Sequence, residues 1–171
     1  MAEKPSLREY QAAFAERLKE ASNQGASASS MLGFVAGGEN WLVELQRVSE
    51  VLPVSGVEPV PLTQEYFIGV CNVRGNLYSI IDFTQLNGKA SIKASADNRL
   101  LILPNDAIHG ASILVTRMAG LRNPDSFKRE VPAAGSKPWV AAVLRDADGQ
   151  PWYVLNIEAL TKQPKFLDVA A

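Results

Sequence analysis

The chain has 171 residues, 47% of them hydrophobic and 20% charged, which is the composition of a folded globular protein and excludes a disordered one. With 17 basic and 18 acidic residues, the net charge of −1 does not favour nucleic acid or an anionic membrane as a partner. One cysteine, Cys71, excludes an internal disulfide, and the sequence shows no secretion signal and no apolar run long enough to cross a bilayer. We therefore expect a cytoplasmic protein without membrane insertion.

The chain begins with a predicted amphipathic helix. A capping-box pattern starts at Ser6, and apolar residues then recur at helical spacing to about Ala21. Small polar residues follow and predict a flexible linker, so the expected organisation is helix and linker at 1–30, a main domain at 31–165 and a tail at 166–171. Amphipathicity alone cannot choose between packing of this helix on its own chain, which we favour, and docking on a partner.

The main domain is predicted to consist of short strands joined by turns. Apolar runs at 31–35 and 41–45 flank a Gly-Gly-Glu-Asn turn and predict a first hairpin. A helical turn is expected at 46–50. The stretch 54–61 contains two prolines, which remove ladder donors, so we expect it to be extended at a sheet edge or crossover.

The clearest hairpin is predicted at 68–83. Two runs rich in β-branched and aromatic residues flank Gly75-Asn76, which suit a tight turn. Arg74 lies at this turn and can make a forked contact with a carboxylate. The second run ends at Asp82, a residue that suits the N-cap of a short helix.

The order of strand, turn, strand, capping residue and helix recurs in the second half. Residues 140–144, a turn at 146–149 and a run at 152–160 repeat it, and Asn156 takes the place of Asp82. Because there are two copies rather than many short ones, the pattern indicates two similar β units and not a repeat array.

The remaining segments complete a mainly β prediction. Residues 99–103 and 108–117 are expected to form a hairpin, and 120–138, rich in Pro and Gly, an irregular connection with at most a brief helix. A terminal helix begins near residue 158, and Phe166-Leu167 offers an apolar anchor for the tail. Many short strands joined by turns favour small barrels or a sandwich.

No residue pattern indicates catalysis, a cofactor or a metal. The single histidine, His109, is far from Cys71 in sequence, and the nucleophile-elbow, P-loop and dinucleotide-binding motifs are missing. Glu50 and Arg74 remain as candidate site residues, with Gly69 nearby permitting close backbone approach. They form either a surface ion pair of little energetic weight or a charged contact of an interaction surface, and the residues alone leave both interpretations open.

These residues resemble the CheW family of chemosensory coupling proteins. Residues 69–75 match the family's G-V-x-N-x-R-G hairpin, the Ile-Asp at 81–82 follows as in the family, and Glu50-Val51-Leu52 matches its E-V/I-L segment. The match covers residues 31–160 and implies two intertwined five-stranded SH3-like β-barrels, with the N-terminal helix and a short C-terminal helix added to them.

The resemblance also implies a function without catalysis or cofactors. Such a protein couples the cytoplasmic tip of a methyl-accepting chemoreceptor to the regulatory domain of a CheA-type histidine kinase, and is recruited to membrane-bound receptor arrays. Apolar surface around Val48 and Val73 would bind the kinase, while Arg74 and the groove between the barrels would face the receptor, and Glu50 would pair with Arg74. The protein-binding residues implied are Val48, Glu50, Gly69, Asn72, Val73, Arg74 and Gly75.

The resemblance has a subtype and two departures. The N-terminal helix and the ending at 166–170 are similar to family members of type IV pilus twitching-motility systems. Thr116 and Asn156 stand where many members have Asp, which puts ancillary contacts of the second barrel in doubt, although Asn still suits a helix cap. The alternatives are a receptor-binding regulator that does not engage the kinase and a small β-barrel that binds a ligand or an oligonucleotide.

Overall fold

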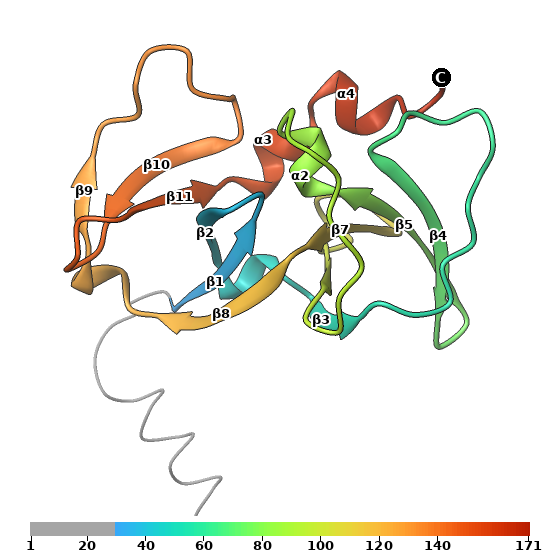
Figure 1. The fold of residues 1–171 in the computed structure, drawn as a ribbon, viewed down its shortest axis with the longest axis horizontal. Coiled ribbons are helices and arrows are strands. Elements are labelled where there is room, and N and C mark those ends of the chain that lie inside the picture. Colours follow the sequence, from blue (N-terminus) through green and yellow to red (C-terminus); the bar gives the residue numbers. More distant parts are fainter. Residues whose placement is uncertain (1–29) are drawn as a thin grey trace, which may run out of the picture.

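The structure is a computed structural model and describes residues 30–171 (Figure 1). The predicted N-terminal helix and linker lie outside the described residues, apart from Ser30. Within this part of the chain, β-strands form two sheets, and the helical segments are short. The predicted mainly β fold is confirmed. One sheet has six strands where five were expected.

The six-stranded sheet combines the two ends of the described chain. Its strand order is β8-β1-β2-β11-β10-β9, so the first hairpin of the domain lies beside the last one. This arrangement makes the two units intertwined rather than consecutive. The strands are β1 (Met31–Ala36), β2 (Glu39–Glu44), β8 (Arg117–Arg122), β9 (Lys128–Glu130), β10 (Val140–Arg145) and β11 (Pro151–Leu155).

The five-stranded sheet is built from the middle of the chain, in the order β3-β6-β7-β5-β4. The expected pairing of 99–103 with 108–117 is confirmed, although the second strand begins only at Ala111. The chain then passes from β7 to β8 and so from one sheet to the other. The strands are β3 (Glu50–Pro53), β4 (Phe67–Val73), β5 (Asn76–Asp82), β6 (Arg99–Ile102) and β7 (Ala111–Val115).

The predicted internal repeat is confirmed. Hairpins β4–β5 and β10–β11 each place their second strand parallel to another strand, β5 beside β7 and β11 beside β2. Each second strand leads into a short capped helix. Asp82 caps α2 (Phe83–Leu86), and Asn156 caps α3 (Ile157–Thr161) by accepting the N–H of Ala159. Asn156 therefore keeps the capping role despite its departure from Asp.

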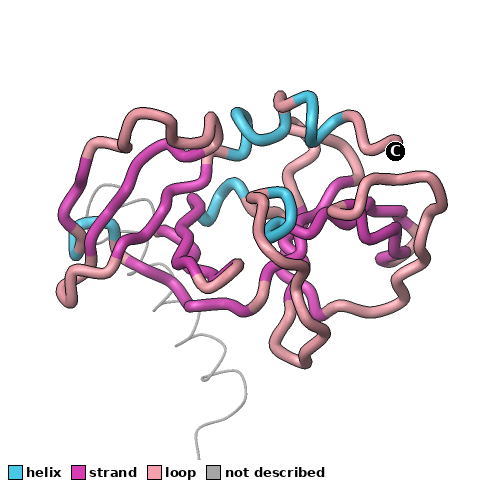
Figure 2. Tube along the Cα trace, turned by 45° about the horizontal axis from the view of Figure 1, so that its top comes forward, coloured by secondary structure: helices cyan, strands magenta, loops and turns pink. Residues whose placement is uncertain are grey.

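Of the predicted apolar anchor Phe166-Leu167, only Phe166 is buried. A last helix, α4 (Pro164–Leu167), buries Phe166 but leaves Leu167 59% exposed. Figures 1 and 2 show the sheets as two lobes, with α2, α3 and α4 near the junction between them.

The hydrophobic core consists of three clusters of buried side chains. One cluster lies within the six-stranded sheet and includes Leu42 and Trp152, and another lies within the five-stranded sheet and includes Cys71 and Ile80. The third draws residues from both sheets and includes Phe34, Trp41 and Phe83. In this third cluster the ring of Phe83, which follows β5, lies 4.8 Å from that of Trp41 in β2 and 5.8 Å from that of Phe34 in β1. Aromatic packing therefore fixes the two sheets against each other.

Three local expectations were wrong. Residues 120–138 are not wholly irregular, because they contain the end of β8 and all of β9 together with the short 3-10 turn η2 (Pro124–Ser126). The central turn of the β4–β5 hairpin is Arg74-Gly75 and not Gly75-Asn76, since Val73 pairs with Asn76. The expected helical turn at 46–50 is the 3-10 turn η1 (Leu45–Arg47), and β3 starts already at Glu50.

Candidate protein-interaction surface

The β4–β5 turn holds Arg74 in an unusual backbone conformation. Its φ is 51° and that of Gly75 is 86°, as a two-residue type I′ hairpin turn requires at both central positions. The left-handed region costs a residue such as Arg about 1–2 kcal/mol relative to a right-handed one. Asn72 offsets part of this cost, because its Oδ1 accepts the backbone N–H of Gly75 at 2.9 Å. Asn72 and Gly75 therefore position Arg74.

Arg74 forms a forked ion pair with Glu50. Its Nη1 donates to Oε2 at 2.8 Å and its Nη2 to Oε1 at 2.6 Å. These hydrogen bonds hold the pKa of the Glu50 carboxyl below its usual value and raise the pKa of Arg74. Because the side chains are 36% and 70% exposed, respectively, the pair adds little stability. The expected pairing is confirmed.

The ion pair joins the two outer strands of the five-stranded sheet. Glu50 begins β3 and Arg74 follows β4, and these strands stand at opposite ends of the strand order. A contact between them closes the sheet into a barrel-like form. The side chains therefore fix the turn against the start of β3.

Gly69 allows the main chain to complete this closure. Glu58 and Val70 exchange two backbone hydrogen bonds of 2.8 and 2.9 Å, which lay the proline-containing stretch along the outer side of β4. Gly69 has a φ of 146°, and a Cβ placed on it would lie 2.2 Å from the carbonyl oxygen of Glu58. Only glycine fits here without a shift of backbone. The edge position expected for this stretch is confirmed.

Val48 and Val73 are both half-buried, but they pack against different clusters of the core. Val48 packs against the cluster shared by the two sheets, and Val73 against the cluster of the five-stranded sheet. The Glu50–Arg74 pair ties their two segments together. On β5, beside the turn, Leu77 is 62% exposed. We call Val48, Glu50, Val73, Arg74 and Leu77 the hairpin surface.

The hairpin surface has the character of a protein-interaction site. It combines an exposed or half-exposed aliphatic side chain on either side of the turn with a fixed pair of opposite charges. Apolar area supplies affinity in such contacts, and charges set specificity and register. Leu77 was not identified from the sequence, because the residue pattern of β5 does not show whether Leu77 points out of the curved sheet or into it.

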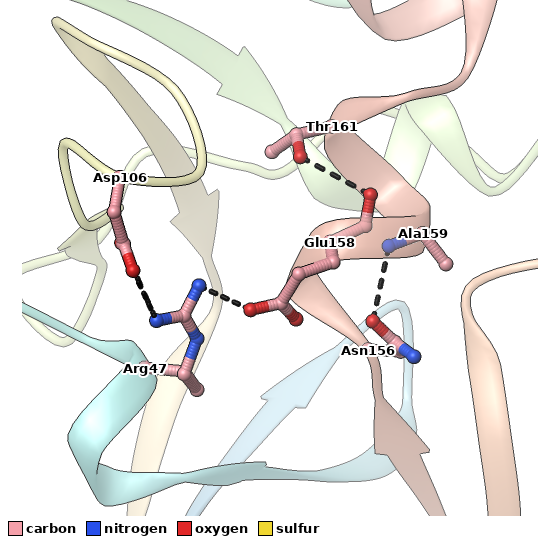
Figure 3. A network of polar contacts seen from close by, with 6 residues as sticks. All are labelled: Arg47, Asp106, Asn156, Glu158, Ala159 and Thr161. Atoms are coloured by element: carbon pink, nitrogen blue, oxygen red, sulfur yellow. Dashed lines mark hydrogen bonds and ion pairs between the residues drawn. The ribbon is translucent and has the colours of Figure 1, made fainter.

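A second charged cluster, also missed from the sequence, is centred on Arg47, the residue before Val48 in the chain (Figure 3). Arg47, at the end of η1, contacts two carboxylates. Its Nη1 lies 3.0 Å from Oδ2 of Asp106, in the loop between β6 and β7, and its Nη2 contacts Glu158 in the first turn of α3. The hydrogen bond from Arg47 lowers the pKa of Asp106. No local pattern could show this cluster, because its members come from three segments far apart in the chain.

Arg47 connects the two units of the fold, and it directly precedes Val48, the first residue of the hairpin surface. Asp106 belongs to a connection within the five-stranded sheet, whereas Glu158 follows the last strand of the six-stranded sheet. Thr116, between β7 and β8, also contributes to the junction between the two units, since its N–H donates to the carbonyl oxygen of Val35 in β1 at 2.9 Å. The junction is thus held by polar contacts as well as by the aromatic core.

The fold and the site define a small two-sheet β protein whose most distinctive surface feature is a rigid, charged hairpin turn. Residues 30–165 match the CheW-like domain, and the chain belongs to this family. The resemblance seen in the sequence is thereby confirmed. In the part of the chain that the structure describes, no helix is long and apolar enough to span a membrane.

Two relatives and one solved structure support the assignment. The chain is 28% identical over 154 residues to protein PilI of Pseudomonas aeruginosa, a match covering 88% of this chain and 85% of that protein. It is 32% identical over 101 residues to the chemotaxis protein CheW of Helicobacter pylori, covering 56% and 61%. Its fold is similar to the scaffolding protein TtCheW of Thermoanaerobacter tengcongensis, with a TM-score of 0.63 and 20% identity over 75% of this chain and 88% of that one.

Proposed function

We propose that this protein is a non-catalytic cytoplasmic adaptor that couples methyl-accepting chemoreceptors to a CheA-type histidine kinase, in an array that controls type IV pilus twitching motility. The observation that carries the proposal is the forked Glu50–Arg74 pair, which presents the family's N-x-R-G turn in a fixed position. The membership of the family and the similarity to PilI and CheW support it.

The kinase would bind the apolar part of the hairpin surface. Val48 and Val73 flank the ion pair and are half-buried, so a partner can cover them at small cost in side-chain entropy. The regulatory domain of the kinase is the expected partner, because the resemblance to the family implies that this domain binds the unit that contains the five-stranded sheet. The charges would set the register of the two surfaces rather than their affinity.

The receptor tip would contact Arg74 and the groove between the units. A guanidinium carries five N–H donors, and the pair with Glu50 uses two of them, so Arg74 keeps donors for a second acceptor. Signals would then pass from receptor to kinase as a coupling between two binding sites on one rigid body.

Reconstitution of the three-component complex tests the proposal. Purified full-length protein, the cytoplasmic fragment of a chemoreceptor from the same cell and its CheA-type kinase would be sedimented together. We expect all three in the pellet with wild-type protein, and less receptor-bound protein with Arg74→Ala. Arg129→Ala, which removes an exposed Arg from β9 in the other sheet, is the matched control and should behave as wild type.

Two results would go against the proposal. If receptor is retained without kinase, the protein is a receptor-binding regulator and the adaptor role is wrong. If neither partner sediments with a protein whose circular dichroism is native, the whole assignment fails. Because unfolding is monitored separately, a loss of binding in Arg74→Ala cannot be mistaken for a loss of structure.

A further inference from the structure

A polar pocket lies at the junction of the two units, away from the hairpin surface. It has a volume of about 230 Å³ and is lined by β2, by residues that follow α2 and by the loop that leads into β10. In Figure 1 this loop and α2 lie at the top of the molecule, whereas the β4–β5 turn and β3 lie at the bottom. The side chains that matter most are Trp41, Asn87, Lys89 and Lys137, together with Glu39 and Tyr153.

The two lysines of the pocket are held in place and each keeps a free donor. Lys137 Nζ donates to the carbonyl oxygen of Asn87 and, at 3.1 Å, to its Oδ1. Lys89 Nζ donates to the carbonyl of Gly37 at 3.2 Å and lies 2.8 Å from Oε1 of Glu39. An ammonium has three N–H donors, so one remains on each lysine among the contacts within residues 30–171.

Trp41 forms part of the wall of the pocket. Its side chain lines the pocket and is only 2% exposed, yet its indole Nε1 has no hydrogen-bond partner among the described residues. That nitrogen is itself enclosed, so the ring of Trp41 borders the pocket without offering it a donor, and the two lysines supply the donors. The other tryptophan near this site, Trp139, is satisfied, because its Nε1 donates to Asn87 Oδ1 at 3.2 Å.

The pocket therefore has an excess of donors, and its charge indicates the kind of acceptor. Among the residues that line the pocket, Lys89 and Lys137 carry two positive charges and Glu39 one negative charge, which leaves a single excess positive charge in the lining. Burial lowers the pKa of Lys137, Glu39 opposes this shift, and Lys165 and Lys89 add to it, so an incoming anion would favour the charged form of Lys137. The volume is below the roughly 300–1,000 Å³ of pockets for drug-sized ligands, which favours a small acidic group over a nucleotide.

We propose that this pocket binds a carboxylate, with Lys89 and Lys137 as its donors and the ring of Trp41 as part of its wall. The single excess charge suits a carboxylate better than a phosphate dianion. The carboxylate belongs either to a small organic acid or to an acidic side chain of a bound protein, since both present the same group. The site is separate from the hairpin surface and does not depend on the adaptor proposal.

The indole N–H signals of the full-length protein in ¹H–¹⁵N NMR spectra test this directly. The chain has three tryptophans, and Trp152 is an internal reference because its Nε1 already donates to Asp146. Sodium propionate would be the small-acid probe, and a short end-blocked peptide with one glutamate the peptide probe. Sodium chloride at the same ionic strength controls for salt. We expect a saturable shift of the Trp41 signal with propionate or the peptide and not with chloride, because the ring borders the pocket.

Lys137→Gln should weaken this binding about tenfold or more, because it removes a charged donor. Lys89→Gln gives an independent test should the first variant fold poorly, and Lys128→Gln on β9 is the matched control that should bind as wild type. A response to propionate identifies a free organic acid, and a response to the peptide alone identifies a partner's side chain. The proposal is overturned if Trp41 responds to neither probe, or if the response is unchanged in a well-folded lysine variant.

Discussion

Replacing Gly69 by Ala should open the edge of the five-stranded sheet. The new methyl group would meet the carbonyl oxygen of Glu58 at 2.2 Å and its carbonyl carbon at 2.8 Å, and both are backbone atoms that cannot rotate away. Either β4 or the stretch beside it must therefore move. Movement of this stretch breaks the two hydrogen bonds between Glu58 and Val70.

The expected loss of unfolding free energy follows from these two effects. Forcing an extra methyl into a filled space costs about 1–3 kcal/mol. Each lost backbone hydrogen bond adds about 1 kcal/mol. Gly69→Ala should therefore lower the free energy of unfolding by about 3–5 kcal/mol beyond the backbone cost of Ala at a positive φ, and it should displace the segment that borders the hairpin surface.

Urea unfolding followed by tryptophan fluorescence measures the loss. Gly56→Ala is the matched control, since Gly56 also has a positive φ, 61°, but a Cβ there would meet nothing within 4 Å. It should lose only the backbone cost of about 1 kcal/mol. The smaller entropy of an unfolded chain with Ala affects both variants equally. If Gly69→Ala is no less stable than Gly56→Ala, the close approach described here is wrong.

Three further predictions concern single groups. Asp82 is fully buried and accepts three backbone N–H groups, whereas Asn156 is exposed and accepts one. In urea unfolding, Asp82→Ala should therefore lower the free energy of unfolding by about 3 kcal/mol and Asn156→Ala by about 1 kcal/mol. Equal losses in the two variants would contradict this. The pKa of Glu50 is lowered in the folded state, so its contribution to stability is present above its unfolded pKa and is lost as pH falls through the folded one. A ¹³C NMR titration should show this low pKa and its return to normal in Arg74→Gln, and an unchanged titration would show that the pair does not persist in solution. Cys71 is 2% exposed and burial raises its pKa, so a thiol reagent should label it far more slowly in native protein than in urea, and equal rates would refute its burial.

Local patterns were sufficient for the hairpins and the repeat. The runs around Arg74 and the second copy ending at Asn156 have alternation, turn residues and a capping residue, which are all short-range signals. These patterns can be recognised in the sequence because a strand with one face in the core must alternate apolar and polar residues. The exact turn was missed by one residue because Arg74 adopts a positive φ that sequence statistics assign to Gly or Asn.

Strands without a buried face were not predictable. Every residue of β9 is exposed, and β8 buries none of its side chains fully, so neither strand has the alternation that marks a half-buried strand. Their places in the sheet come from pairing with β1 and β10 and not from their own composition. The same holds for the contact of β11 with β2, which joins the two ends of the described chain.

The candidate site was only partly visible in the sequence. The separate residues of the pair could be named, yet their contact depends on β3 and β4 reaching each other across the whole sheet. Arg47 with Asp106 and Glu158, and the lysines around Trp41, are assembled from distant segments and carry no local motif. Such clusters exist only after the chain has folded.

Calorimetry with the purified regulatory domain of the CheA-type kinase from the same cell tests most directly the proposed binding of the kinase to the hairpin surface. Wild-type protein, Val48→Glu and a control, Leu121→Glu, would be compared, since Leu121 is 63% exposed on β8 in the other sheet. We predict measurable binding by wild type and control and none by Val48→Glu, with the circular dichroism of all three unchanged. Absence of binding by wild type, or equal binding by a folded Val48→Glu, would contradict the account.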